Sequence, residues 1–267
     1  NSGGINVEVG SSSQVAGDVI VSAGAGSEGG MLSLAAGNSG SVNVRAGDDI
    51  SIVTMNMLTE ESGDISIASG SSEVESGDIS IRSGDSFTSH AGSVSVVAGS
   101  GASAVGAGAV LSGGVSTLSG GVGGVAKISG GDGSFGGEVQ LNGGQGLSNN
   151  GGTVSIAGGN GNVLGGGDIV ASAGNGATGG SLSFSAGSSS QFEEQGGRVS
   201  IAAGNSLNNA GGSVSVVGGV STEGTGGSVS LSSASNAGRS GDVSIGSGDS
   251  MKSASGSLIL STGSADK

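Results

Sequence analysis

The chain has 267 residues, of which 63 are glycine and 4 are phenylalanine, and it contains no proline, cysteine, tryptophan or tyrosine. Seven Lys and Arg residues against 21 Asp and Glu residues give a net charge of -14, which disfavours nucleic-acid binding and attraction to an anionic membrane, because both need a cationic surface. No apolar run approaches the roughly 18 residues of a membrane-spanning helix, so membrane insertion is not expected.

One phrase recurs along the chain: glycine, a small or acidic residue, an aliphatic, usually serine, a second aliphatic, two more residues and glycine. It begins as GGINVEVG at 3–10, and regular copies read GDISIASG at 63–70, GSVSVVAG at 92–99 and GSVSVVGG at 212–219. Neighbouring copies in a run are about 14–15 residues apart, and a fixed short period of this kind is the signature of a repeat architecture.

Each copy alternates aliphatic and small polar residues, which is typical of a half-buried strand. In the copy at 212–219, Val214 and Val216 share one face of the predicted strand. One repeat cannot cover this face alone, whereas stacked repeats can. We therefore predict an all-β fold, a parallel β-solenoid with one or two repeats per coil, in which the aliphatic pairs are buried: Val199/Ile201, Val214/Val216 and Val229/Leu231.

A polar, glycine-rich return of turn-forming residues joins each predicted strand to the next. The residue after the strand is small in copy after copy, as at Ala98 and Ala203, and is expected to point inward. Glycines at the corners are expected to adopt positive φ and to allow close backbone approach. Many returns carry one large apolar residue that is expected to complete the core: Val74, Phe87, Leu147, Phe192, Leu207 and Met251.

Two stretches interrupt the pattern. Residues 47–62 lack internal glycine and carry Met55, Met57 and Leu58, which indicates a bulged coil or a longer edge that packs on another segment. Residues 99–137 are almost entirely Gly, Ala, Ser, Val and Leu, with an ambiguous register. Neither stretch reads as a domain boundary, so residues 1–267 are predicted to form a single continuous domain.

Residues that could carry catalysis are few. His90 is the only histidine, and its neighbours give no sign of a nucleophile, so it is interpreted as an exposed turn residue. Asp64 and Asp78 occupy the same repeat position and would lie on neighbouring coils, but a chain without Trp or Tyr lacks the aromatic surface on which enzymes hold sugars. The sequence therefore predicts no enzyme and no cofactor. Calcium remains an alternative occupant of the aspartate column, which comprises Asp18, Asp64, Asp78, Asp168 and Asp242.

A serine column runs between the strand aliphatics, as at Ser66, Ser95 and Ser215. A flat array of hydroxyl groups suggests ice or glycan binding as an alternative function. Threonine is rare, however, and Arg82 and Lys127 would interrupt the face, so a passive solvated face is the preferred interpretation.

Six large aliphatic residues fall at strand positions that should face away from the interior of a coil. Large apolar residues on an otherwise Ser- and Asp-rich surface often mark a contact site. The open ends of a solenoid also present strand edges that can pair with another molecule. We therefore predict that these residues are assembly contacts: Ile20, Val53, Val97, Val170, Val217 and Ile259.

The run GGSVSVVGGVSTEGTGGSVSLSS at 211–233 and the Gly/Ser-rich sequence at 151–187 resemble Gly/Ser-rich tandem-repeat proteins predicted to be secreted by diatoms and related algae. GDISIASG and GDVSIGSG are also similar to the short repeats of bacterial filamentous adhesins. The resemblance implies an extracellular or cell-surface protein with no catalytic residues to carry over. We expect a non-enzymatic structural protein of an extracellular filament, matrix or adhesive layer, which associates end to end with itself or with other matrix proteins. The alternative is an ice- or glycan-binding solenoid.

Overall fold

The computed structural model describes residues 3–26, 29–57 and 61–264. The chain divides into two units, Asn1–Ile128 and Ser129–Lys267. Their boundary falls within residues 99–137, one of the two stretches that interrupt the repeat. The single continuous domain expected from the sequence stays a prediction.

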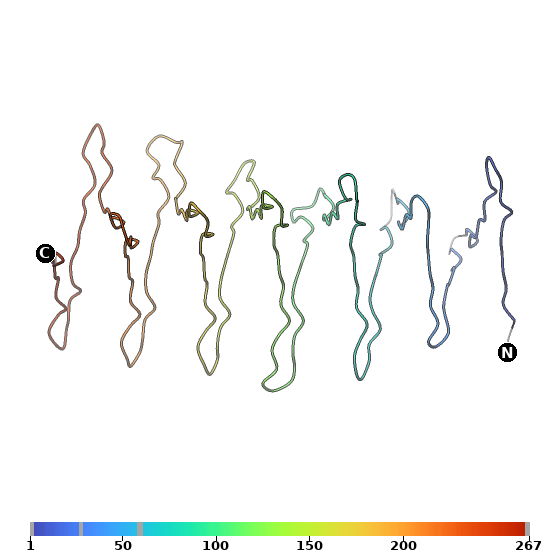
Figure 1. Ribbon diagram of the computed structural model, residues 1–267, viewed down its shortest axis with the longest axis horizontal. Helices are drawn as coiled ribbons and strands as arrows, with labels where there is room; N and C mark the ends of the chain where they lie inside the picture. Colours follow the sequence, from blue (N-terminus) through green and yellow to red (C-terminus); the bar gives the residue numbers. More distant parts are fainter. Residues whose placement is uncertain (1–2, 27–28, 58–60, 265–267) are drawn as a thin grey trace. The chain divides into compact units, whose positions relative to one another are not determined.

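The predicted parallel β-solenoid is wrong: the described residues contain no α-helix and no β-strand, and Figure 1 draws neither along the trace. Alternation of aliphatic and serine residues favours an extended segment, but a strand also needs a neighbour about 4.8 Å away, and the alternation does not specify one. The 63 glycines add to the difficulty, since each loses more conformational entropy on ordering than any other residue. Among the described residues, no helix could cross a membrane.

The predicted core is also absent from the described part of the chain, in which no residue is buried. The pairs Val199/Ile201, Val214/Val216 and Val229/Leu231 are 53–76% exposed. The chain as a whole exposes 26878 Å² of surface, whereas a compact monomer of its mass exposes about 10,000 Å² and its fully unfolded chain about 35,000 Å². Most of the surface that folding normally removes from water therefore stays exposed.

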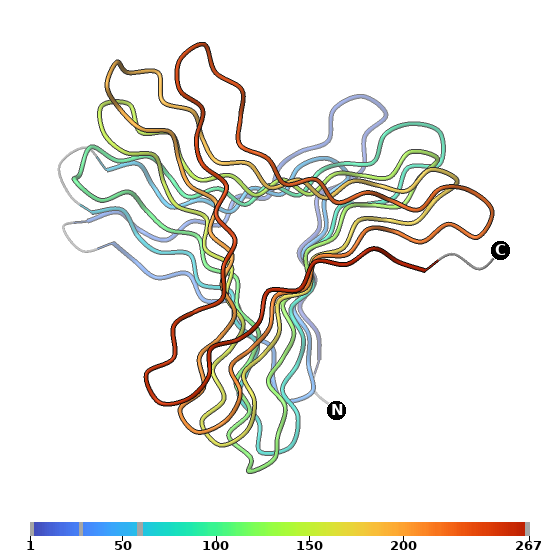
Figure 2. The ribbon, with the colours of Figure 1, turned by 90° about the vertical axis from the view of Figure 1, so that its left-hand side faces the viewer.

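The regular feature of the structure is the return, which forms a loop (Figure 2). In many returns a pair of glycines closes this loop. We call this pair the neck: the carbonyl of the opening glycine accepts a hydrogen bond from the N–H of the closing glycine. In the second unit, Gly159 O accepts from Gly167 N at 2.8 Å, and Gly204 O accepts from Gly212 N at 2.9 Å. Necks also close the following returns: 24–30, 37–40, 114–124, 131–137, 144–152, 174–180, 187–197 and 219–227.

The small residue before each opening glycine lies against the closing glycine. A Cβ placed on Gly212 would stand 3.3 Å from the Cβ of Ala203, and one placed on Gly197 would stand 3.2 Å from the Cβ of Ala186. The sequence marks this position as small, and the neck explains why. Five of the half-buried residues in the described chain occupy this position at a neck, namely Gly113, Gly130, Gly158, Ala203 and Gly218; the other three, Thr54, Ser83 and Ala98, do not precede the opening glycine of a neck.

The corner glycines were expected both to adopt positive φ and to allow close backbone approach. The structure shows the close approach at the necks, whereas positive φ is rare. Gly120, at φ 80°, is the one glycine with positive φ in the described chain. At the necks, the space for a side chain is missing. A Cβ on Gly158 would fall on the carbonyl oxygen of Gly167, and a Cβ on Gly130 would fall on that of Gly137. These positions therefore exclude even alanine unless the backbone moves.

The large apolar residues of the returns lie at bends and do not complete a core. Phe87, Leu147, Leu207 and Met251 are each at a bend in the chain and are almost fully exposed. Val74 and Phe192 are exposed in the same way. Their predicted inward orientation is wrong, because the described residues form no packed surface towards which these side chains could turn.

We predict that Gly158→Ala opens its loop whereas Gly159→Ala does not. The first substitution places a methyl group on the Gly167 carbonyl, and the second meets nothing within 4 Å. Loss of the neck hydrogen bond removes about 1 kcal/mol, which corresponds to roughly fivefold faster amide exchange at Gly167 in Gly158→Ala. Hydrogen exchange measured by NMR on both variants checks this, and equal rates at Gly167 would contradict the role of the neck.

Candidate functional site

The six predicted assembly contacts are all exposed. Three lie in the first unit and three in the second, and each is 79–87% exposed: Ile20, Val53, Val97, Val170, Val217 and Ile259. Their accessibility permits a contact with another molecule but does not test it. Their role in assembly stays a prediction.

Exposure rises along many of the aliphatic segments, by which we mean the residues from the first aliphatic of a repeat to the opening glycine. At Val214, Val216 and Val217 the exposed fractions are 57%, 72% and 82%. Val217 is thus the last aliphatic of its segment and its most accessible side chain, whereas Ile20 and Ile259 each lie between two other aliphatics. The whole segment offers apolar surface, so a partner could meet more than one side chain of each copy.

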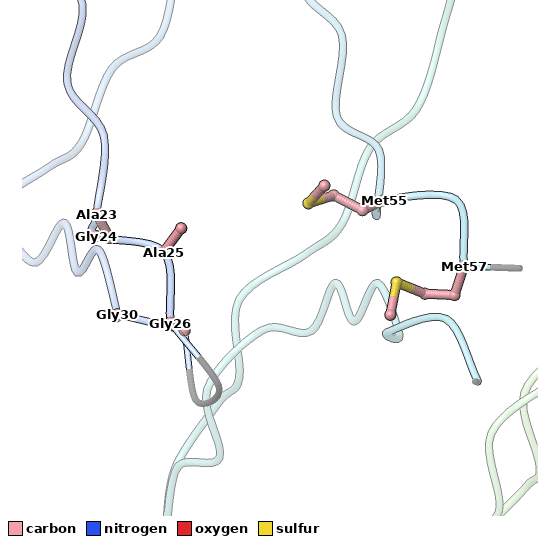
Figure 3. Close-up of a pocket in the computed structure, with 8 residues that line it drawn as sticks. Ala23, Gly24, Ala25, Gly26, Gly30, Met55 and Met57 are labelled. Atoms are coloured by element: carbon pink, nitrogen blue, oxygen red, sulfur yellow. The ribbon is translucent and has the colours of Figure 1, made fainter. Parts of the chain in front are cut away.

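Two methionines and a glycine-rich loop line a recess in the first unit. The recess has a volume of about 510 Å³ and lies between the loop around Ala23–Gly30 and the side chains of Met55 and Met57. Figure 3 shows both methionine side chains extending towards the loop. The sequence predicts that the stretch 47–62 bulges or packs on another segment. Two of its apolar residues, Met55 and Met57, lie at this recess. Leu58 is outside the described residues. Flexible, polarisable thioethers suit apolar contact more than catalysis.

A second recess, which we call the aliphatic recess, lies elsewhere in the first unit. Its volume is about 310 Å³, and it is lined by Val96, Ala109, Val110 and Leu111. Val96 and Ala109–Leu111 come from successive stretches of the chain on either side of a glycine-rich return. Because the lining is entirely aliphatic, the recess can accept an apolar side chain.

Ionisable side chains do not gather into a catalytic or metal-binding group in the described ranges. There, no three His, Asp or Glu side chains come close enough together to hold a metal ion. Asp242 of the aspartate column lies 3.8 Å from Arg239, and both side chains are largely exposed, so the pair contributes little to stability. His90 lies on the surface beside the bend at residues 87–89. The expectations of no cofactor and no enzymatic activity, and the calcium alternative, stay untested.

The necks are the functional geometry that the sequence analysis missed. The signal for them is the glycine doublet, since closing glycines such as Gly152, Gly167 and Gly227 are each the second residue of a Gly-Gly pair. Where serine precedes the glycine, as at Gly77 and Gly241, the nearest atom to an added Cβ is a serine Cβ at 4.0 Å. In most returns the doublet therefore marks closure by a hydrogen bond; the exception is the neck at 37–40, where Ser39 precedes the closing glycine.

Comparison with protein-family models, with curated proteins and with solved structures finds no match for this chain.

We predict that hydrogen peroxide oxidises Met55 faster than Met57, because the exposed fractions of the two side chains are 82% and 47%. Conversion of the thioether to the sulfoxide needs access of the oxidant to sulfur, so Met57 should react at about half the rate of Met55. Met251, which is fully exposed at the bend of its return, serves as the internal reference. Tandem mass spectrometry of the peptide that contains both methionines measures the ratio. Equal rates at Met57 and Met251 would show that Met57 is not sheltered by the recess.

Proposed function

We propose that this chain is a non-enzymatic structural repeat protein of an extracellular filament, matrix or adhesive layer, and that it works by association with further copies of itself or with other matrix proteins. The observation that carries the proposal is the exposure of the aliphatic segments. Repeat after repeat presents branched aliphatic side chains to solvent, at the positions of the predicted contacts and beside them.

The free energy of apolar surface supports association. Removing such surface from water contributes about 25 cal/mol per Å². A chain that exposes 26878 Å² has covered little of its apolar surface internally, whereas contacts between copies can cover it. The repeat itself supports a structural role, because each copy presents the same residues in the same order and can therefore make the same contact many times.

The large apolar residues at the bends support an adhesive contribution. Phe87, Leu207 and Met251 each stand at the turning point of a return and are almost fully exposed. Single exposed apolar residues are common on proteins. Here they recur once per return in many repeats, which gives a series of spaced contact points.

The extracellular or cell-surface location is supported by the resemblance of residues 151–187 and 211–233 to secreted Gly/Ser-rich repeat proteins. The alternative of ice or glycan binding depends on a flat serine-rich face. That face required the regular ladder of a solenoid, and the described residues form no strands. The described residues therefore do not support this alternative.

We predict that the protein associates as ionic strength rises. A net charge of -14 makes copies repel one another at low salt. The Debye length falls from about 30 Å at 0.01 M to about 8 Å at physiological ionic strength, so that exposed aliphatic segments can meet. Sedimentation velocity over a range of protein and salt concentrations, repeated with added calcium, measures the association. A strictly monomeric protein under every condition would make the structural proposal untenable.

A further inference from the structure

The carboxylates are distributed unevenly along the chain. All 21 Asp and Glu residues lie in residues 1–85 or 132–267. Residues 86–131, which we call the neutral segment, contain no carboxylate, and their only ionisable side chains are His90 and Lys127. In a chain of net charge -14, this is the longest stretch in which another acidic molecule meets no negative side chain.

The neutral segment also exposes many apolar side chains. Val97 and Val110 are 82% and 92% exposed, and the aliphatic recess lies between their parts of the chain. Up to Ile128 the segment lies in the first unit. Its other exposed large aliphatics are Val94, Val96, Val105, Leu111, Val115, Leu118, Val122, Val125 and Ile128.

Electrostatics decides which of the exposed segments can best meet a second copy. Val53 follows Asp48 and Asp49 closely, and Val170 stands two residues after Asp168. A contact between copies at these places would bring carboxylates together and remove them from water, and both effects cost free energy. A contact through the neutral segment buries aliphatic surface and leaves the carboxylates of both copies in solvent.

We propose that the neutral segment is the principal contact surface between copies of this chain, and that its partner is the neutral segment of a second copy. The proposal rests on the self-association proposed above and names the residues that carry it. A two-fold contact uses the same patch on both molecules, so the patch must be compatible with itself. An aliphatic patch without carboxylates, whose one charged side chain is Lys127, meets this requirement, and the aliphatic recess can take an apolar side chain from the partner.

The two copies of the repeat at 92–99 and 212–219 provide a matched pair of variants. They read GSVSVVAG and GSVSVVGG, and their last aliphatics, Val97 and Val217, are both 82% exposed. Val97→Glu places a carboxylate in the neutral segment, whereas Val217→Glu makes the same change outside it. We expect Val97→Glu to raise the dissociation constant of self-association at least about tenfold, and Val217→Glu, at one of the other predicted contacts, to raise it by a clearly smaller factor. Sedimentation velocity at physiological ionic strength measures both.

A charge-complementation experiment tests the contact in a way that misfolding of one variant cannot imitate. Val97→Glu and Val97→Lys are each expected to associate weakly, because like charges meet in the contact. An equimolar mixture should associate more tightly than either variant alone, since opposite charges then meet. A mixture that behaves as the average of its components would overturn the assignment of the contact.

The remaining outcomes separate this inference from the proposed function. Wild-type protein that associates, with Val97→Glu and Val217→Glu equally impaired or equally unaffected, overturns the neutral segment as the contact while the structural function stands. Wild-type protein that never associates overturns both. Binding of monomeric protein to phosphatidylcholine vesicles, lost in Val97→Glu, without association of copies, would show that the segment meets a lipid surface and would also overturn the inference.

Discussion

The glycine neck is the constraint on which the rest of this structure depends. One backbone hydrogen bond, such as that from Gly167 N to Gly159 O, closes a return on itself. At the 159–167 neck the two backbones approach so closely that a Cβ on Gly158 would overlap the Gly167 carbonyl, whereas the 204–212 neck accommodates Ala203 at the same position. At the closer necks glycine is therefore required for space. Since the loop is closed locally, its bend residue has no interior to enter, and the aliphatic segment beside it is left without a cover.

This local closure links the exposed apolar surface to the proposed role. The necks organise the returns, but they bury no aliphatic side chain, so the segments around Val96 and Val216 stay accessible. A protein of this kind gains the burial that stabilises ordinary domains only through contact with other molecules. The distribution of charge then selects where the contact is least costly. Most of the chain is acidic and favours solubility, whereas residues 86–131 are uncharged apart from His90 and Lys127.

The repeat and its small residue could be predicted from the sequence, but the fold could not. The positions of Ala98 and Ala203 follow from the pattern; both are half-buried, and Ala203 lies at a neck. The solenoid was inferred from the alternation at Val214 and Val216, which specifies a face but no neighbour. A β-sheet forms only when two segments pair in register, and glycine-rich returns of different lengths do not determine which segments pair. Most necks could have been predicted from the sequence, because their closing glycine is the second residue of a Gly-Gly pair. The predicted contacts depend on a partner, which no single chain contains.

The central claim is that the aliphatic segments are covered by contacts between copies and not within one chain. Hydrogen exchange followed by mass spectrometry, on dilute monomer and on the assembled protein, tests it most directly. The backbone amides of residues 92–98 are expected to exchange rapidly in the monomer and to become protected on assembly, because covered backbone groups must find hydrogen-bond partners. The neck amides of Gly167 and Gly212 should be protected in both states. Protection of residues 92–98 in the dilute monomer would contradict the account, since it would mean that the chain covers its own aliphatic segments.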